Sequence, residues 1–289
     1  MKQNRQWLRL TAALLCAVLA VALVGCSGGD SIEAKLKSVA ENLAKQESYE
    51  YTMNMSMGLS MLGNDVAVET AMDGTVFNDP LKARIVSNVS MMGNSVEVEM
   101  YMVQEGDNYA IYTGTMGQWQ KQTASKAEFE AKSGQYDAQD SMALYLKNAR
   151  NFQDMGYEDV EGVSALKVQG FLSGDSIKEV METSGVLDNA ASSMEGVDEK
   201  ELMDKMVAKI GDLPVTLWID EKEMLPLKYE VDMTDMVKGM YDVIFEQMGV
   251  DPAEAQFEAG DAIISMLCRN YGAAAAFEIP AEALAADAA

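Results

Sequence analysis

Three methionines alternate with polar residues in one short stretch, and their thioethers are the first groups in the sequence that could carry chemistry. Met53, Met55 and Met57 form an M-x-M-x-M row, with about 6.6 Å between successive members along one face of a strand. Thioethers bind Cu(I), so one interpretation is a copper chaperone. The alternation itself already requires apolar residues at these positions, which suits a core or the pliant wall of an apolar cavity.

Methionine also recurs on other predicted apolar faces of the chain. Copper-binding methionines are expected on exposed loops or beside His or Cys ligands, so we predict no metal and no cofactor. An ordinary packed core remains the alternative to a ligand-contacting wall at each position. The candidates for that wall are Met53, Met55, Met57, Met72, Met100 and Met102.

Residues suited to catalysis are scarce. The sequence has no histidine, which excludes Ser-His-Asp and Cys-His nucleophile systems, imidazole metal ligands and His general bases. Ser164 and Lys167 fit the S-x-x-K pattern of penicillin-recognising enzymes, but that serine should open a helix and here it precedes an apparent strand. Acid–base catalysis needs carboxylates held in one cleft, and their spacing does not require that here. We therefore interpret the carboxylates as parts of solvated surfaces. The sequence predicts a protein that is not an enzyme.

The N-terminal segment has the composition of an export signal. Cationic residues precede an apolar run that ends in Leu23-Val24-Gly25-Cys26. This tetrapeptide resembles a bacterial lipobox, in which the cysteine thiol receives diacylglycerol and the chain is cut just before it. The resemblance implies a lipoprotein signal peptide over residues 1–25, an acyl (palmitate-type) anchor on Cys26 and a flexible tether over residues 26–31. We then expect the protein on the extracytoplasmic face of the cell membrane, anchored through the diacylglycerol.

The charge balance excludes polyanionic partners. With 22 Lys and Arg against 46 Asp and Glu, the net charge at pH 7 is −24, and such a surface repels nucleic-acid phosphates and anionic headgroups. We expect no nucleic-acid partner, and membrane association through acyl chains rather than charge. After export and lipidation only Cys268 would remain as a free thiol. No intrachain disulfide is then expected, and the fold must be held by its core.

A helix and an antiparallel meander are predicted to position the methionines. Apolar residues recur at helical spacing between residues 31 and 44. Alternating apolar and polar residues then predict a run of strands. These strands cover residues 49–61, 66–76, 81–91, 95–103 and 109–113, and a sixth begins at Trp119.

Two of the predicted hairpins are internal repeats. Segments 59–73 and 89–103 match at eight of fifteen positions, and each carries a Gly-Asn pair suited to a two-residue turn. The first turn would set Met61 opposite Val66, and therefore Met55 opposite Met72. The second would set Ile85 opposite Met102 in the same way. Both hairpins then place their apolar residues on one face.

Helices and further strands are predicted after the meander. A helical pattern follows Asp140 and extends to Phe152, and we predict strands over residues 165–172, in a hairpin over residues 214–234, and at an edge over residues 277–284. Further helices are predicted to begin at Asp175, Asp198, Thr234 and Asp251. Since no break in composition divides the chain, we predict one α+β domain over residues 32–285.

The late hairpin carries a resemblance to a known superfamily. Leu217-Trp218-Ile219-Asp220, a charged turn and Leu225-Pro226-Leu227-Lys228 are similar to a hairpin of the lipoprotein carriers, which include LolA, LolB and the mycobacterial LppX/LprG lipid-binding lipoproteins. Uncharacterised lipobox-bearing lipoproteins of Gram-positive bacteria look similar too. Met224 stands where the family often has glycine. The resemblance implies a curved antiparallel β-sheet (half-barrel) with α-helices packed on its concave side around an apolar cavity.

Two functions follow from these expectations. The first is an exported, membrane-anchored lipoprotein that binds or carries a lipid or other hydrophobic ligand in the half-barrel. The alternative is a cell-envelope interaction or sensing module that uses the half-barrel only as a scaffold.

Overall fold

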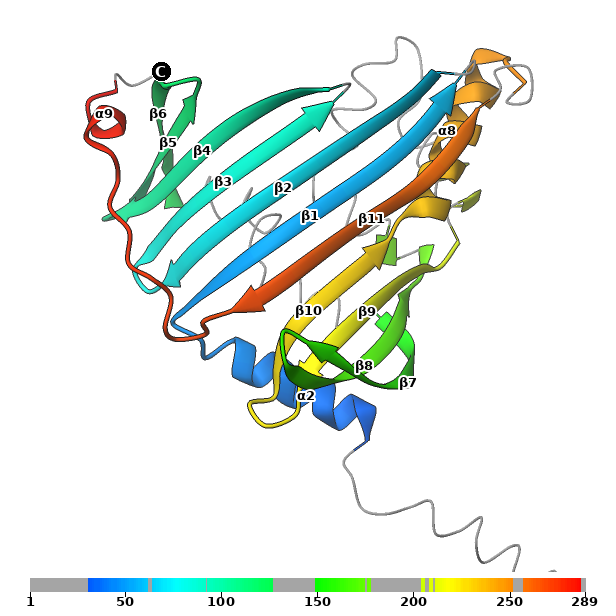
Figure 1. Cartoon of the computed structure of the whole chain (residues 1–289), viewed down its shortest axis with the longest axis horizontal. Helices are drawn as coiled ribbons and strands as arrows, with labels where there is room; N and C mark the ends of the chain where they lie inside the picture. The colour runs from blue at the N-terminus through cyan, green and yellow to red at the C-terminus, as the bar shows by residue number, and fades with distance from the viewer. Residues whose placement is uncertain are drawn as a thin grey trace, which may run out of the picture.

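Eleven strands form one antiparallel sheet in the part of the chain that the computed structural model describes, which comprises residues 31–61, 64–91, 93–126, 149–174, 176–177, 204–205, 208–209, 211–251 and 257–286. The spatial order is β6-β5-β4-β3-β2-β1-β11-β10-β9-β8-β7, so the first strand lies beside the last (Figure 1). The strands are β1 Ser48–Met61, β2 Asn64–Asn78, β3 Leu81–Met91, β4 Asn94–Glu105, β5 Asn108–Thr115, β6 Gln118–Ser125, β7 Ala149–Val160, β8 Val163–Leu172, β9 Leu213–Asp220, β10 Leu225–Asp232 and β11 Glu258–Arg269. The helices are α2 Ile32–Leu43, α8 Thr234–Met248 and α9 Ala281–Leu284.

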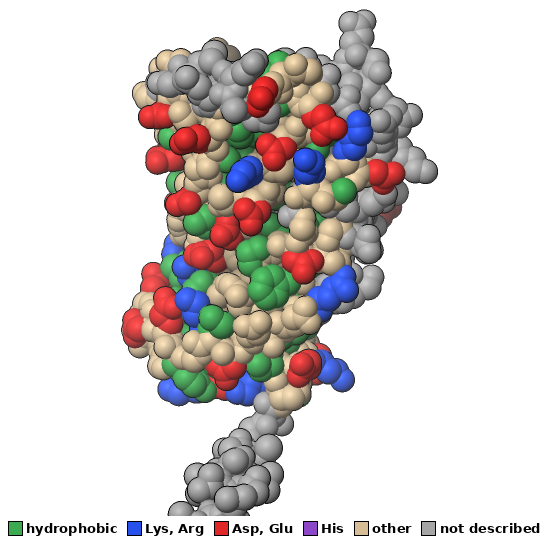
Figure 2. Space-filling model, turned by 90° about the vertical axis from the view of Figure 1, so that its right-hand side faces the viewer, with side chains coloured by type: hydrophobic (Ala, Val, Ile, Leu, Met, Phe, Trp, Pro, Cys, Tyr) green, Lys and Arg blue, Asp and Glu red, His purple; other side chains and the backbone are tan. Residues whose placement is uncertain are grey.

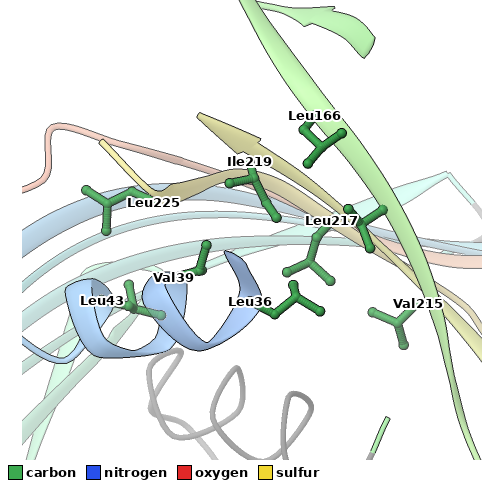
Figure 3. Close-up of a cluster of buried hydrophobic side chains, with 9 residues drawn as sticks. Leu36, Val39, Leu43, Leu166, Val215, Leu217, Ile219 and Leu225 are labelled. Carbon is green, nitrogen blue, oxygen red and sulfur yellow. The ribbon is translucent and has the colours of Figure 1, made fainter. Parts of the chain in front are cut away.

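The predicted α+β half-barrel is confirmed. The sheet is curved and open, and α2 packs on its concave side (Figures 1 and 3). The meander from β1 to β6, strand β8 and the hairpin of β9 and β10 all form where alternation predicted them, as do helices α2 and α8. The leader, Cys26, the tether as far as residue 30, the helix start at Asp140, and the caps at Asp175 and Asp198 lie outside the described residues. The helix predicted to begin at Asp251 lies outside them over residues 252–256, and from Glu258 the chain forms β11 instead.

The register of both predicted hairpins differs from the prediction by two residues. Met61 pairs with Asn64 rather than Val66, so Met53 and not Met55 lies opposite Met72. In the second hairpin Met91 likewise pairs with Asn94. The turn therefore lies one residue earlier than the Gly-Asn pair suggested. Because side chains alternate with a period of two, the shift leaves every residue on its predicted face.

The helix predicted to extend to Phe152 is wrong from Ala149 onward, where β7 begins. Ala149 and Arg150 pair with the end of β8, and Phe152 packs against the core under α2. The free edge of β8 supplies backbone partners to this segment, and that tertiary pairing overrides its local helical periodicity.

Two predictions near the C-terminus are also corrected. Residues 277–284 do not form an edge strand: Phe277 and Ile279 pack on the convex face, and α9 follows. The last strand is instead β11, which the sequence did not indicate. Its outward residues Ile263 and Leu267 are apolar, which conceals the alternation, and Leu267 packs beside Trp218 on the convex face.

The main core lies between α2 and the half of the sheet formed by β8, β9 and β10. Leu36, Val39 and Leu43 of α2 point at Leu217 and its neighbours in the sheet (Figure 3). Burying each such side chain contributes about 1.5–3 kcal/mol. The helix begins at a Ser31 cap whose hydroxyl accepts from the Ala34 amide at 3.2 Å. Lys35 ties the helix to the sheet through an ion pair with Glu221.

A close approach in the sheet sets the position of one tyrosine. The ring of Tyr51 in β1 lies against Gly74 in the neighbouring strand β2, and a Cβ at residue 74 would fall 2.1 Å from the nearest ring atom. Tyr51 is only 8% exposed, so its ring has little room to move away. Glycine is required at residue 74 because the tyrosine ring occupies the space of a side chain.

We therefore expect Gly74→Ala to lower the free energy of unfolding by about 1–3 kcal/mol through overpacking. In a Tyr51→Leu background the same substitution should be neutral or stabilising, since alanine suits a strand better than glycine once the ring is gone. Urea unfolding of the unmodified protein, Gly74→Ala, Tyr51→Leu and the double variant measures the coupling free energy between residues 51 and 74. Gly58→Ala is the matched control, because its added Cβ would meet nothing nearer than 3.7 Å. An equal cost of Gly74→Ala in both backgrounds would contradict this packing.

Candidate ligand-binding face

The concave side of β1 to β4 and β11, which we call the inner face, carries rows of side chains that run across the strands. The cross-strand pairs place Met266 of β11, Met53 of β1 and Met72 of β2 next to one another. The row continues on one side to Tyr229 of β10 and on the other to Ser87 of β3. A run of adjacent thioethers therefore lies at the centre of the sheet.

The six predicted methionines all lie on the inner face, and all are half-buried. Met55 lies one row from Met53, opposite Ile264 and Thr70, and Met57 lies in the row beyond it. Met100 and Met102 occupy β4 and are separated from the others by β3. The structure thus brings four of the six together on two neighbouring strands, while the other two form a separate pair on the same face.

The inner face is most open near the end of β3. Val89 and Met91 lie there with exposed fractions of 38% and 52%, and both belong to inner-face rows through their partners Thr70 and Val68. Large apolar side chains are seldom left exposed together without a binding role. The apolar surface of the inner face is therefore incompletely covered at this end.

A cluster of tyrosines borders the methionines where β1, β11 and β10 meet. Tyr49, Tyr51 and Cys268 are buried, and Tyr229 and Tyr271 pack against them. The ring centroid of Tyr49 lies 6.3 Å from that of Tyr51 and 6.2 Å from that of Tyr271. The hydroxyl of Tyr271 donates a hydrogen bond to the carbonyl of Pro226 at 2.8 Å.

The groups in this tyrosine cluster are neutral at physiological pH. Burial raises the pKa of Tyr51 to about 12 and that of the Cys268 thiol to about 11. Burial is also the main cause that raises the pKa of Tyr229 and of Tyr271. Desolvation penalises the charged form of each group, so phenols and thiol stay protonated. The cluster offers hydrogen-bond donors and no nucleophile.

Charged side chains in β1 to β4, β10 and β11 point away from the inner face. Three ion pairs lie on the convex side of the sheet. They are Arg84–Glu99, Arg269–Glu50 and Lys228–Glu230, with N···O distances of 3.7, 3.8 and 3.0 Å. Acidic side chains also spread over the side of the molecule seen in Figure 2, with Lys and Arg among them. The two faces of the sheet therefore differ sharply in polarity.

The structure gives no support to a catalytic S-x-x-K motif. Ser164 and Lys167 lie three residues apart in β8, and side chains at that spacing in a strand point to opposite faces. Lys167 pairs with Glu158 at 2.8 Å and lies over the ring of Trp218. Within the described ranges, no group of three or more His, Cys, Asp or Glu side chains could hold a metal ion. Thioethers are not among these ligand types, so the prediction that the methionines bind no copper stays a prediction.

Sequence reasoning missed three residues of this face. Met266 was missed because β11 itself was not predicted, although its inward positions alternate as Ala262, Ile264, Met266. Tyr51 and Tyr229 were seen as parts of strands, and their proximity depends on the long-range placement of β11 between β1 and β10.

Comparison with known proteins finds that the chain is similar to a carrier protein. It is 27% identical over 186 residues to the lipoarabinomannan carrier protein LprG of Mycolicibacterium hassiacum, which covers 62% of this chain and 78% of that protein. This match confirms the resemblance to the lipoprotein carriers. None of the described helices has both the length and the apolar character needed to cross a bilayer.

Two solved structures match over most of the chain. Mycobacterium tuberculosis LppX is 15% identical with a TM-score of 0.46, over 83% of this chain and 94% of that one. Mycobacterium bovis LprF is also 15% identical with a TM-score of 0.47, over 89% of this chain and 100% of that one. A family model described as a family of unknown function, DUF6612, matches residues 31–251. The chain therefore belongs to the DUF6612 family.

Proposed function

We propose that this protein is a membrane-anchored lipoprotein that binds or carries a lipid or another hydrophobic ligand on its inner face. The observation that carries the proposal is the methionine-rich inner face, which is uncharged in the paired rows, half-buried at its centre and exposed at Met91. Further support comes from the relative LprG, whose name describes a lipoarabinomannan carrier.

The inner face has the physical properties that an acyl chain needs. Removing a methylene group from water contributes about 0.8 kcal/mol, so even part of a fatty chain gains several kcal/mol on an apolar surface. Methionine has three rotatable bonds and a polarizable sulfur, so Met53, Met55 and Met72 can adapt to chains of different shape. Catalysis would need acid–base groups on this face, whereas its described rows present thioethers, aliphatic groups, hydroxyls and a thiol. The proposed role is therefore non-enzymatic.

The anchor completes the proposal. Diacylglycerol on Cys26 and the tether over residues 26–31 would hold the domain on the extracytoplasmic face of the membrane. Because α2 begins at Ile32, the tether would join the domain directly at the helix that covers the β8–β10 half of the sheet. A ligand would then be received close to the membrane from which it comes.

Replacing two inner-face methionines by an isosteric polar residue tests ligand binding. We expect Met53→Gln/Met55→Gln to bind dioleoylglycerol at least about tenfold more weakly, because the amides must lose their water without gaining partners. Asn54→Gln/Ser56→Gln, on the opposite face of the same strand, is the matched control and should bind as the unmodified protein does. Native mass spectrometry of the purified protein gives the bound fraction, and solvent extraction identifies any lipid that copurifies.

The proposal would be contradicted if the purified protein carried no lipid and bound neither added dioleoylglycerol nor another apolar probe. Capture of a specific protein by in-cell cross-linking, together with that result, would favour the envelope interaction or sensing module.

Lipidation is tested separately at Cys26. Cells fed an alkynyl palmitate should label the protein, and Cys26→Ala should abolish the label and release the protein from the membrane fraction, since a lipid chain supplies its membrane affinity. Cys268→Ala, which removes the buried thiol of β11, is the control and should keep the label. A label that survives Cys26→Ala would show that this cysteine is not the anchor.

A further inference from the structure

Methionine is distributed unevenly between the two halves of the concave side. In the half that α2 covers, the buried residues of the core cluster are leucine, isoleucine and valine, and a partly buried Met224 packs against them. On the inner face of β1, β2 and β4 the half-buried apolar residues include Met53, Met72 and Met100. Unlike leucine, isoleucine and valine, methionine carries a sulfur that an oxidant can modify. The face proposed to bind the ligand is therefore the half that is rich in oxidisable side chains.

Met91 is an inner-face methionine that is open to solvent. It is 52% exposed, whereas Met266 is 3% exposed and the six predicted methionines are half-buried. The cross-strand pairs place Met57, Val68 and Met91 in one row. Oxidation requires access to the sulfur, so Met91 should react before its neighbours deeper on the face.

The reaction changes the polarity of the row at this point. A molecule of hydrogen peroxide gives one oxygen atom to the thioether of Met91: the O–O bond breaks, an S–O bond forms, the sulfur loses two electrons and the other oxygen leaves as water. The product, methionine sulfoxide, is polar where the thioether was apolar. Methionine sulfoxide reductases can return it to the thioether with electrons from a dithiol, which becomes a disulfide as water is released.

The exposure of Met91 makes its sulfoxide a burden on the ligand rather than on the fold. In the free protein the sulfoxide keeps its water. A ligand that covers the row must remove that water, and Val68 and Val89 beside the sulfoxide offer no side-chain donor to replace it. Asn94 lies on the other side of Met91 from Val68. Oxidation of the buried Met266 would instead place a polar group inside the packed structure and destabilise the protein itself.

We propose that Met91 is an oxidation site that controls ligand binding: its conversion to the sulfoxide by hydrogen peroxide or a related two-electron oxidant weakens binding on the inner face, and reduction of the sulfoxide restores it. This inference rests on the proposed function and adds a regulation of the same face.

Two other exposed methionines separate oxidation itself from its effect on the ligand. Met116 is 84% exposed in the turn between β5 and β6, and Met155 is 49% exposed in β7, at one edge of the sheet. Neither belongs to the inner-face rows of β1 to β4 and β11. Both should react with peroxide about as readily as Met91, and neither reaction should affect ligand binding.

Graded oxidation of the purified protein tests the proposal. Peptide mass spectrometry measures the sulfoxide at Met91, Met116 and Met155 separately, and native mass spectrometry measures the affinity for dioleoylglycerol. We expect a roughly tenfold loss of affinity that follows the sulfoxide at Met91, the effect of one polar group buried without a partner. Bound dioleoylglycerol should slow the oxidation of Met91 and leave that of Met116 unchanged. Methionine sulfoxide reductases A and B with dithiothreitol should restore the affinity.

Single substitutions assign the effect to one sulfur. At peroxide concentrations that oxidise Met116, the affinity of Met91→Leu should no longer fall, whereas that of Met116→Leu should fall as in the unmodified protein. Met91→Gln places a polar group of similar length in the row and should weaken binding without any oxidant. Met116→Gln is its matched control and should bind as the unmodified protein does.

The control by oxidation is refuted, while the carrier function stands, if peroxide lowers the affinity of Met91→Leu as much as that of the unmodified protein. Loss of affinity that parallels a lower midpoint of urea unfolding would also refute it, because the damage would then lie in the core. If the reduced, unmodified protein binds neither dioleoylglycerol nor any other apolar lipid, the proposed function fails and this inference fails with it.

Discussion

The pairing of β1 with β11 is the contact on which the rest of the structure depends. It joins the meander of β1 to β6 with the group of β7 to β10, which would otherwise be separate sheets. Glu50 pairs with Arg269 and Ser60 with Glu258, so residues about 200 positions apart in the chain must meet. Each ladder hydrogen bond contributes about 1 kcal/mol net, and the apolar inner face adds burial to that gain. Without this pairing neither the methionine row nor the tyrosine cluster would exist.

A second constraint follows from the two-residue period of strands. Each in-register pair adds one inner-face residue to a row, so apolar residues at alternate positions of every strand form continuous apolar rows across the sheet. Where α2 covers that face, the rows are aliphatic and fully buried, as at Leu217 and Ile219. Where the methionines lie, the rows are half-buried. The same sheet thus has one half whose inward residues pack against α2 and another whose inward methionines are half-buried.

Polarity follows the same division. Acidic residues outnumber basic ones in the chain, yet those described in β1 to β4, β10 and β11 lie on the convex face, where ion pairs such as Arg84–Glu99 form. The polar groups of the inner face include phenols and a thiol, and burial keeps these protonated and neutral. A strongly acidic protein therefore presents an uncharged surface to its proposed ligand. Electrostatic repulsion between protein and anionic membrane need not oppose ligand transfer, since the proposed contact is made by neutral groups.

Much of this protein could be predicted from the sequence, because alternation is a local property. The strands from β1 to β5 and the inward position of all six candidate methionines follow from it, and even a turn misplaced by one residue left Met53 and Met55 on the right face. Residues from Ala149 form a strand because they pair with the edge of β8. Strand β11 forms because it pairs with β1 on one side and β10 on the other. The meeting of Tyr51, Tyr229 and Met266 was decided by tertiary structure alone. Side-chain orientation within a strand is set by the residues themselves, whereas which strands become neighbours is set by long-range backbone pairing and burial, which no local pattern contains.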